Sequence, residues 1–374
     1  MPEKVKKNEE NIKVKVGKIK FEKVIRSAKI HSPLDSYKLV EQKIEYRKDP
    51  LTNHYSRINK LRADRVKQAT MPSENYEQNL QSVIENSSKK CFFCPENVEK
   101  STPRFPKELG LGDRIKQGTF TLFPNLFVFS QYHAVGTLGD KHFTPLQDFT
   151  PEIWQDAIAG SIKYFKAVNK FDKSVKYPSI NFNYLPPSAS SIIHPHIQII
   201  QDVKPTKYTE ILMGRSKQYA KNGSNYWLDL IEAEKEINER FITENNFMAW
   251  IATYSPLGKN ELTGIVKIPK TDISVFTKEE STELAKGISQ ALKALYIGRG
   301  ATSVNVAMYI GPINEDHYDS FRINLRIVTR PNLMPNYTGD IGFMELLHFE
   351  PIAAATPESI AESVKEQFNE AYNQ

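Results

Sequence analysis

The segment His194-Pro195-His196-Ile197-Gln198 constrains this 374-residue chain more than any other feature. Isoleucines lie within and beside it, at positions 193, 197, 199 and 200, a composition typical of a buried strand. Alternate side chains of a strand share a face, so we expect His194, His196 and Gln198 to point together. Two imidazoles and an amide are costly to bury without partners, and a phosphate or a metal ion would satisfy them.

Composition and charge exclude several classes of protein. A length of 374 residues, 40% hydrophobic and 25% charged, indicates two globular domains. No apolar run is long enough to span a bilayer and no secretory signal is evident, so we expect a cytoplasmic protein without a membrane partner. The net charge of +6 fits an anionic small molecule. Nucleic acid is a weaker alternative, because no basic run is interleaved with aromatic residues.

Patterning along the chain predicts its organisation. Residues 1–35 are expected to form a basic, disordered tail, 36–205 a first domain, 206–245 a charged helical connection and 246–374 a second domain. Helices are expected to begin after Thr150 and Thr277, which have the residues of helix caps. Strands are expected over residues 120–130, 179–185, 247–254, 264–268, 303–310 and 321–329.

A weak internal similarity predicts a duplication. Residues 183–187 parallel residues 308–312, and His196-Ile197-Gln198 parallels Arg322-Ile323-Asn324 at the same distance before a proline. Repeats of this kind indicate a structural unit used twice. The second copy, with arginine and asparagine, could bind phosphate but could not supply a nucleophile.

Six segments match one known family in the same order. They are Glu45–Thr52, Leu61–Arg65, Cys91-Phe92-Phe93-Cys94-Pro95, Phe129–His133, the stretch from Asn183 through Ser191 to Gln198, and Gly342–Leu346. The chain thereby resembles the galactose-1-phosphate uridylyltransferase branch of the histidine-triad nucleotidyltransferases and phosphorylases. The resemblance implies an α+β fold, with two tandem histidine-triad-like motifs in a large, mainly antiparallel sheet and helices packed outside.

The resemblance implies that His196 is a nucleophile that forms a nucleotidyl-histidine, stabilised by Gln198 and Ser191. This agrees with the chemistry of the residues, since neutral imidazole both attacks and leaves near pH 7. Hydrogen-bond donors such as an amide and a hydroxyl stabilise charge on the phosphoryl oxygens. The alternative is a structural histidine pair within a sheet.

Cys91 and Cys94 have the spacing with which two thiolates hold one tetrahedral zinc ion. The resemblance adds His133 and His194 as the other two ligands and implies that the zinc is structural. A redox-active thiol pair is the competing interpretation, but no βαβ pattern follows it. His142 and the remaining histidines have no partner spacing and are expected to be surface or capping residues.

Substrate-binding residues are less sharply defined. The resemblance points to Arg62 and Arg65 for phosphates, Asn183 for the nucleotide and Glu345 for a sugar. Arg322, Arg326 and Arg330 lie at alternate positions of one strand, so three like charges there need an anion, acidic partners or solvent. The paired histidines of the family's second metal site are missing from this strand, and the sugar specificity is therefore open.

The sequence thus predicts a nucleotidyltransferase that acts on a nucleoside diphosphate sugar or a dinucleotide, with a sugar phosphate or phosphate as acceptor. A phosphorylase that uses inorganic phosphate is the nearest alternative. A zinc-stabilised, non-catalytic nucleotide-binding protein is the alternative outside the enzymes. The oligomeric state is open, with a homodimer as one possibility because related enzymes are often dimers.

Overall fold

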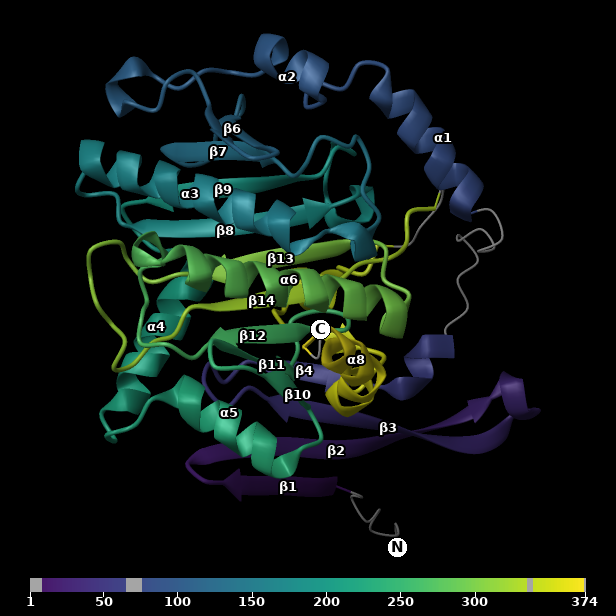
Figure 1. The fold of residues 1–374 in the computed structure, drawn as a ribbon. Coiled ribbons are helices and arrows are strands. Elements are labelled where there is room, and N and C mark those ends of the chain that lie inside the picture. The colour runs from purple at the N-terminus through teal and green to yellow at the C-terminus, as the bar shows by residue number, and fades with distance from the viewer. Residues whose placement is uncertain (1–8, 65–75, 335–338, 373–374) are drawn as a thin grey trace, which may run out of the picture.

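The computed structural model describes residues 9–64, 76–334 and 339–372, and a ten-stranded sheet runs through its centre (Figure 1). The strand order is β10-β11-β12-β14-β13-β8-β9-β7-β6-β5, and neighbouring strands are antiparallel throughout. The strands are β5 (Ile115–Gln117), β6 (Phe120–Pro124), β7 (Tyr132–Thr137), β8 (Tyr177–Tyr184), β9 (His196–Asp202), β10 (Phe241–Glu244), β11 (Met248–Ala252), β12 (Leu262–Val266), β13 (Val304–Tyr309) and β14 (Asn324–Thr329). The α+β fold predicted from the sequence is confirmed.

The sheet consists of two similar halves that meet where β8 pairs with β13. In the first half Thr137 faces His196 and Val135 faces Gln198. In the second half the corresponding pairs are Ile265 with Asn324 and Thr263 with Arg326. When the two halves are matched at the first residues of β9 and β14, Asn324 and Arg326 align with His196 and Gln198, whereas the alignment made on sequence alone paired His196 with Arg322.

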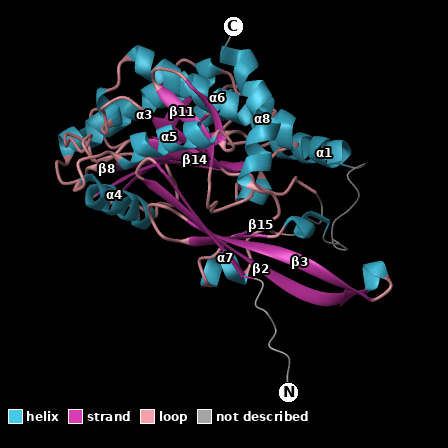
Figure 2. Cartoon of the chain, turned by 90° about the horizontal axis from the view of Figure 1, so that it is seen from below, coloured by secondary structure: helices cyan, strands magenta, loops and turns pink. Residues whose placement is uncertain are grey.

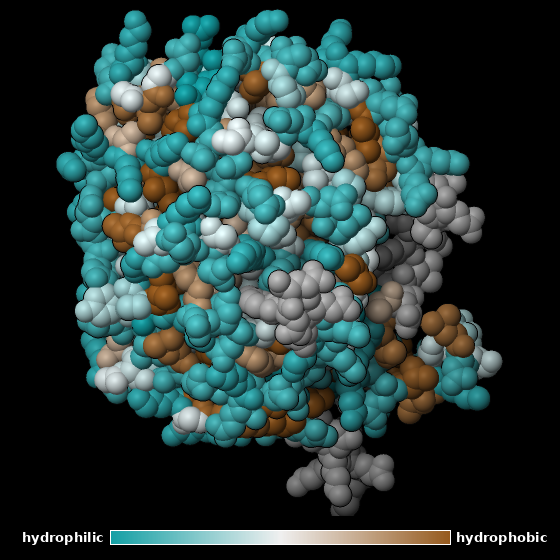
Figure 3. Space-filling model, viewed as in Figure 1, coloured by the Kyte–Doolittle hydropathy of each residue, from teal (hydrophilic) through white to brown (hydrophobic). Residues whose placement is uncertain are grey.

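Two long helices cover one face of the sheet, α3 (Pro151–Phe171) and α6 (Lys278–Arg299). Both begin where the sequence predicted, and Thr277 closes a capping box with Glu280 at the start of α6. Their apolar sides form most of the main core with the strands, while their outer sides are largely hydrophilic (Figure 3). The final helix α8 (Pro357–Tyr372) packs against α6.

The opposite face differs between the two halves. In the second half it is covered by α4 (Lys207–Ala220) and α5 (Tyr226–Ile237), which form a second core with β11 and β12. These helices lie in the segment predicted to be a helical connection. In the first half a small cluster of Phe93, Val98, Phe123 and Val135 joins the short helix α2 (Pro95–Ser101) to the sheet. The thirteen-residue helix α1 (Tyr76–Ser88) precedes it.

A second sheet forms an arm that projects from the body (Figure 2). It contains β1 (Glu9–Val16), β2 (Ile19–Ser32), β3 (Lys38–Lys48), β4 (Tyr55–Ile58) and β15 (Ile352–Ala353), and the short helix α7 (Phe343–Leu347) precedes β15. Residues 1–8 lie outside the described chain. A disordered tail was expected over residues 1–35, but residues 9–32 form the strands β1 and β2. The reason is that Val16, Ile19 and Phe21 are buried against α5, and this outweighs the many lysines around them.

The strand expected over residues 120–130 ends early, at Pro124. Proline offers no N–H to a neighbouring strand, and the side chain of Asn125 accepts a hydrogen bond from the backbone of Phe127 at 2.9 Å, which turns the chain. Residues 126–129 are consequently exposed in a loop. No helix of the described chain is both long and apolar enough to cross a bilayer.

Candidate active site

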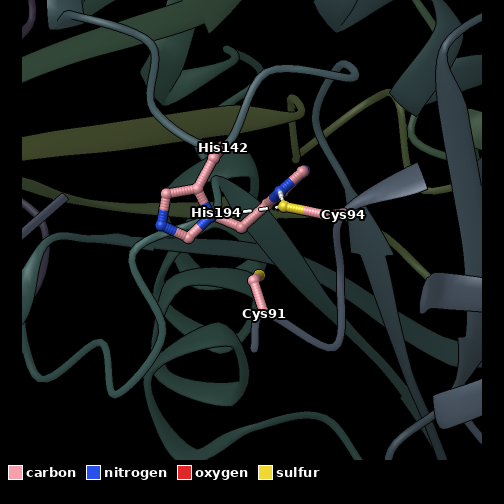
Figure 4. Close-up of side chains that lie close together, drawn as sticks. All are labelled: Cys91, Cys94, His142 and His194. Carbon is pink, nitrogen blue, oxygen red and sulfur yellow. Dashed lines mark hydrogen bonds between the residues drawn. The ribbon is translucent and has the colours of Figure 1, made fainter. Parts of the chain in front are cut away.

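Four side chains converge beside the N-terminal end of β9: Cys91, Cys94, His142 and His194 (Figure 4). Their potential ligand atoms all lie within 4.8 Å of one another. The two cysteines are buried and unpaired by disulfide, and Cys94 is the residue directly before α2. Two sulfurs and two nitrogens at this separation are a donor set that tetrahedral zinc prefers.

Hydrogen bonds fix which nitrogen of each histidine faces the cluster. His194 Nε2 donates to the carbonyl of Gly139 at 3.2 Å, so Nδ1, 3.6 Å from Cys94 Sγ, carries the lone pair. His142 Nδ1 lies 3.4 Å from the same sulfur, while its Nε2 bonds to the hydroxyl of Ser87 at 2.8 Å. Outer hydrogen bonds of this kind orient metal-binding histidines. The cluster therefore fits a metal ion.

Burial disfavours the charged forms of His194, His142 and Cys94. It lowers the pKa of His194 to about 4 and also lowers the pKa of His142. It raises the pKa of the Cys94 thiol to about 12, with a further contribution from the neighbouring Cys91. Lone pairs on nitrogen are thus available at neutral pH, whereas the thiols must lose protons when a metal binds.

The structure brings His142, and not His133, to this cluster. Strand β7 runs antiparallel to β9, with Thr137 opposite His196 and His133 opposite Ile200. His133 therefore lies four residues along the strand from His196, about 13 Å at 3.3 Å per residue, on the side away from His194. His142 follows the other end of β7, which contacts the active strand through the bond from Leu138 N to Pro195 O. No signal for His142 was present in the sequence, because only the pairing of β7 with β9 shows that the residues after β7 reach His194.

His196 begins β9, is 7% exposed and contacts the ring of Phe93 at a centroid distance of 5.1 Å. Its Nδ1 lies 2.9 Å from the backbone carbonyl of His194. Because a carbonyl only accepts, Nδ1 must carry the proton and Nε2 the lone pair. Burial lowers the pKa of His196, so the ring is neutral near pH 7. The geometry thus presents one nucleophilic nitrogen.

Two of the predicted partners lie beside His196. Gln198 is half-buried on the same face of β9, with its Oε1 3.1 Å from His133 Nε2. Asn183 follows Phe182, which pairs with Ile197, so the register continues to place it opposite His196. Its side-chain oxygen accepts a bond from Asn305 Nδ2 at 2.7 Å. Asn305 lies on β13, so the second half of the chain supports the site of the first.

The other predicted residues lie in different settings. Ser191 is exposed at a bend before the strand, and Arg62 is exposed in a short helical turn, Lys60–Asp64. Arg65 lies outside the described residues. Arg322 is buried and donates to the backbone carbonyls of Lys267, Tyr318 and Phe321.

The next two arginines, at positions 326 and 330, each form an ion pair with an acidic residue. Arg326 is buried against Glu261 at 2.5 Å and Arg330 binds Asp340 at 2.6 Å. The arginine stripe is therefore not a free anion site. Glu345 is also engaged, because its carboxylate accepts bonds from the backbone of Gly342 at 2.8 Å and of Ile352 at 3.1 Å.

Comparisons with known proteins agree with this architecture. No family model matches the chain. An uncharacterised protein of Archaeoglobus fulgidus is 31% identical over 358 residues, which cover 94% of this chain and all of that protein. The crystal structure of an ADP-glucose phosphorylase from Arabidopsis thaliana, with bound ADP-glucose, superposes with a TM-score of 0.65 at 16% identity, covering 86% of this chain and 99% of that one.

Two further solved structures share the fold. A GalT-like protein from Arabidopsis thaliana has a TM-score of 0.63 at 17% identity, covering 86% of this chain and 98% of that one. A uridylyltransferase mutant has the same TM-score and identity, with coverage of 87% and 98%. The chain therefore belongs to one family with the Archaeoglobus fulgidus protein, and it shares the fold of the ADP-glucose phosphorylase, the GalT-like protein and the uridylyltransferase.

Proposed function

We propose that this protein is a nucleotidyltransferase that passes a nucleoside monophosphate from a donor to an acceptor through His196. The observation that carries the proposal is the tautomer of this ring: the bond from Nδ1 to the His194 carbonyl leaves Nε2 as an uncharged nucleophile. A histidine with a purely structural role does not need an unbonded nitrogen lone pair beside the polar side chains of Gln198 and Asn183. The shared fold with nucleotide-sugar enzymes supports the same reaction class.

The reaction divides into two displacements at the α-phosphorus. In the first, the Nε2 lone pair forms a bond to phosphorus, and the bond from phosphorus to the bridging oxygen breaks with its electron pair staying on the leaving phosphate. In the second, an acceptor phosphate oxygen attacks the same phosphorus and the P–N bond breaks, returning the lone pair to Nε2. Imidazole is both a sufficient nucleophile and a sufficient leaving group for this.

Neighbouring groups have roles in binding and charge stabilisation. The half-buried amide of Gln198 donates to a non-bridging oxygen, where negative charge is stabilised by a fixed donor. Asn183, held by Asn305, is placed to bind the nucleotide, and the exposed Ser191 hydroxyl can turn toward the same phosphate. Arg62 and Arg65 are proposed to reach the outer phosphates.

The same proposal assigns Cys91, Cys94, His142 and His194 as ligands of a structural zinc ion. Zinc bound there would cross-link the segment before α2 to the residue two positions before His196. The ion is thereby expected to fix the approach to β9. His196 itself is not part of the donor set.

The donor is proposed to be a nucleoside diphosphate sugar or a dinucleotide. The acceptor is either a sugar phosphate or inorganic phosphate, and one observation favours phosphate. Glu345, expected to read sugar hydroxyls, has both carboxylate oxygens bonded to backbone N–H groups instead. Phosphorolysis is therefore the second candidate function, and the similarity to an ADP-glucose phosphorylase supports it.

The test is to trap the covalent intermediate. Wild-type protein is incubated with ADP-glucose, UDP-glucose or a diadenosine polyphosphate that is labelled at the α-phosphorus, and is then denatured in alkali. We expect acid-labile label on wild type and on the control His31→Ala, a change at the exposed arm tip, and none on His196→Ala. Peptide mass spectrometry should place the adduct on His196.

Two results would contradict the proposal: turnover by wild type without any bound label, or label retained on His196→Ala. Once a donor is known, adding sugar phosphates and inorganic phosphate in turn identifies the acceptor. Release of label only by inorganic phosphate would establish phosphorolysis over transfer to a sugar phosphate.

A further inference from the structure

His133, which does not belong to the metal cluster, lies behind the proposed active site. It is 3% exposed, at the start of β7, on the same face of the sheet as Gln198. Its Nε2 lies 3.1 Å from Gln198 Oε1 and its Nδ1 lies 3.4 Å from the backbone nitrogen of Phe129. The Phe129 ring packs on the imidazole at a centroid distance of 4.1 Å. The ring is therefore held between the loop after β6 and the side chain of Gln198.

Two contacts, from the Phe129 N–H to Nδ1 and from Nε2 to Gln198 Oε1, favour a proton on Nε2 of His133, and one contact, from Asn125 Nδ2, favours a proton on Nδ1. A backbone N–H can only donate, so Nδ1 accepts, and in a neutral ring the proton then resides on Nε2. Burial lowers the pKa of His133, which agrees with a neutral ring. Asn125 Nδ2 lies 3.0 Å from the same Nε2 and would gain a bond only in the opposite tautomer. The position of this proton can be measured from the ¹⁵N shifts of the ring.

The proton on Nε2 determines the orientation of the Gln198 carboxamide. A donor at Nε2 selects the carbonyl oxygen of Gln198 as its partner and leaves the NH₂ group directed away from His133. A lone pair at Nε2 would select the NH₂ group and leave the carbonyl oxygen for the substrate. Only the first arrangement offers a donor to a negatively charged phosphoryl oxygen, since the second would place oxygen against oxygen.

We propose that His133 is a positioning residue that holds the Gln198 amide with its N–H toward the transferring phosphoryl group. The inference rests on the proposed function and adds a residue that touches neither substrate nor metal. Loss of such an outer hydrogen bond is expected to slow formation of the His196 adduct by about tenfold to a hundredfold.

The experiment is a double-mutant cycle on the single-turnover rate of adduct formation. His133→Phe keeps a ring in the buried site and removes the hydrogen bond, and Gln198→Ala removes the group that His133 orients. We expect His133→Phe to slow the wild type by about tenfold or more, and to change the Gln198→Ala background by less than about twofold. His31→Phe, the same substitution at the arm tip, should leave the rate unchanged.

A purely structural role for His133 would slow both backgrounds by the same factor, and that result would overturn the inference. A second measurement is independent of turnover: the ring ¹⁵N shifts of His133 in the labelled full-length protein should show a proton on Nε2. A proton on Nδ1 alone would also overturn it. If wild type forms no adduct with any donor, the proposed function fails instead, whatever the tautomer of His133.

Discussion

A cluster of buried ions attaches the arm to the body and gives a quantitative prediction about stability. Arg47 on β3 is 1% exposed and makes two bonds to Glu358 on α8, at 2.8 and 2.9 Å. Arg240 also binds Glu358, at 3.1 Å, and stacks on the ring of Phe21 from the arm at 4.8 Å. The Glu358 carboxylate therefore joins residues from three parts of the chain.

The magnitude follows from the pKa of Glu358. Bonds from Arg47, and the charge of Arg240, outweigh the opposing effect of burial and lower this pKa from 4.5 to about 2. At about 1.4 kcal/mol per pH unit, the difference is about 3 kcal/mol of folding stability at neutral pH. Since the folded pKa lies below the unfolded one, this stability is present above pH 4.5 and is lost as the pH falls toward 2.

The perturbation is Glu358→Gln, which resembles the protonated side chain. We expect urea unfolding to show a loss of about 3 kcal/mol at pH 7, which shrinks to about 1 kcal/mol at pH 3 because wild type itself is losing the same interaction. Glu362→Gln, an exposed position on the same helix, is the matched control and should change stability by less than about 0.5 kcal/mol at both pH values.

Glu234 does not complicate this window. Burial raises its pKa to about 7, so it is protonated in the folded protein between pH 2 and 4.5, and its destabilising effect begins only as the pH rises above 4.5. At pH 7 the charge of Glu358 helps to raise the pKa of Glu234, so Glu358→Gln also removes a repulsion there, and about 3 kcal/mol is the upper value of the expected loss. A loss from Glu358→Gln no larger than that from Glu362→Gln, or one as large at pH 3 as at pH 7, would refute the reasoning.

Two further predictions concern the metal cluster and the core. Cys91→Ala and His142→Ala should each abolish stoichiometric zinc, measured by elemental analysis, and lower thermal stability, because zinc-binding energy is folding energy; His133→Ala should retain the zinc, and its loss there would contradict the assignment of His142. Gly160→Ala should cost about 1–3 kcal/mol by urea unfolding, because its Cβ would lie 2.5 Å from the buried ring of Phe120. Gly214→Ala, in a helix with open space around it, should instead raise the free energy of unfolding by up to about 1 kcal/mol. An equal change in the two variants would show that packing against Phe120 is not the cause.

Local patterns in the sequence predicted the two long helices and the central strands of the main sheet. The helices α3 and α6 follow from Thr150 and Thr277, because a cap and a 3.6-residue apolar period involve only neighbouring residues. The thiol pair and the His-Pro-His segment were likewise visible in the sequence, since their chemistry depends on short spacing. The strands of the arm were missed because the apolar residues Val16, Ile19 and Phe21 are few among lysines, and only burial against α5 reveals their role.

The tertiary structure alone decided which distant residues meet. His133 lies near the start of β7 and His142 follows its end. The sequence could not show that β7 runs antiparallel to β9, which brings His142 to His194 and His133 to Gln198. Arg322, Arg326 and Glu345 carried the right charges for a substrate, but their partners come from other strands and from the backbone. The type of a residue determines which chemistry it can perform. Which residues lie close together depends on strand direction and register, and these are set by packing across the whole sheet.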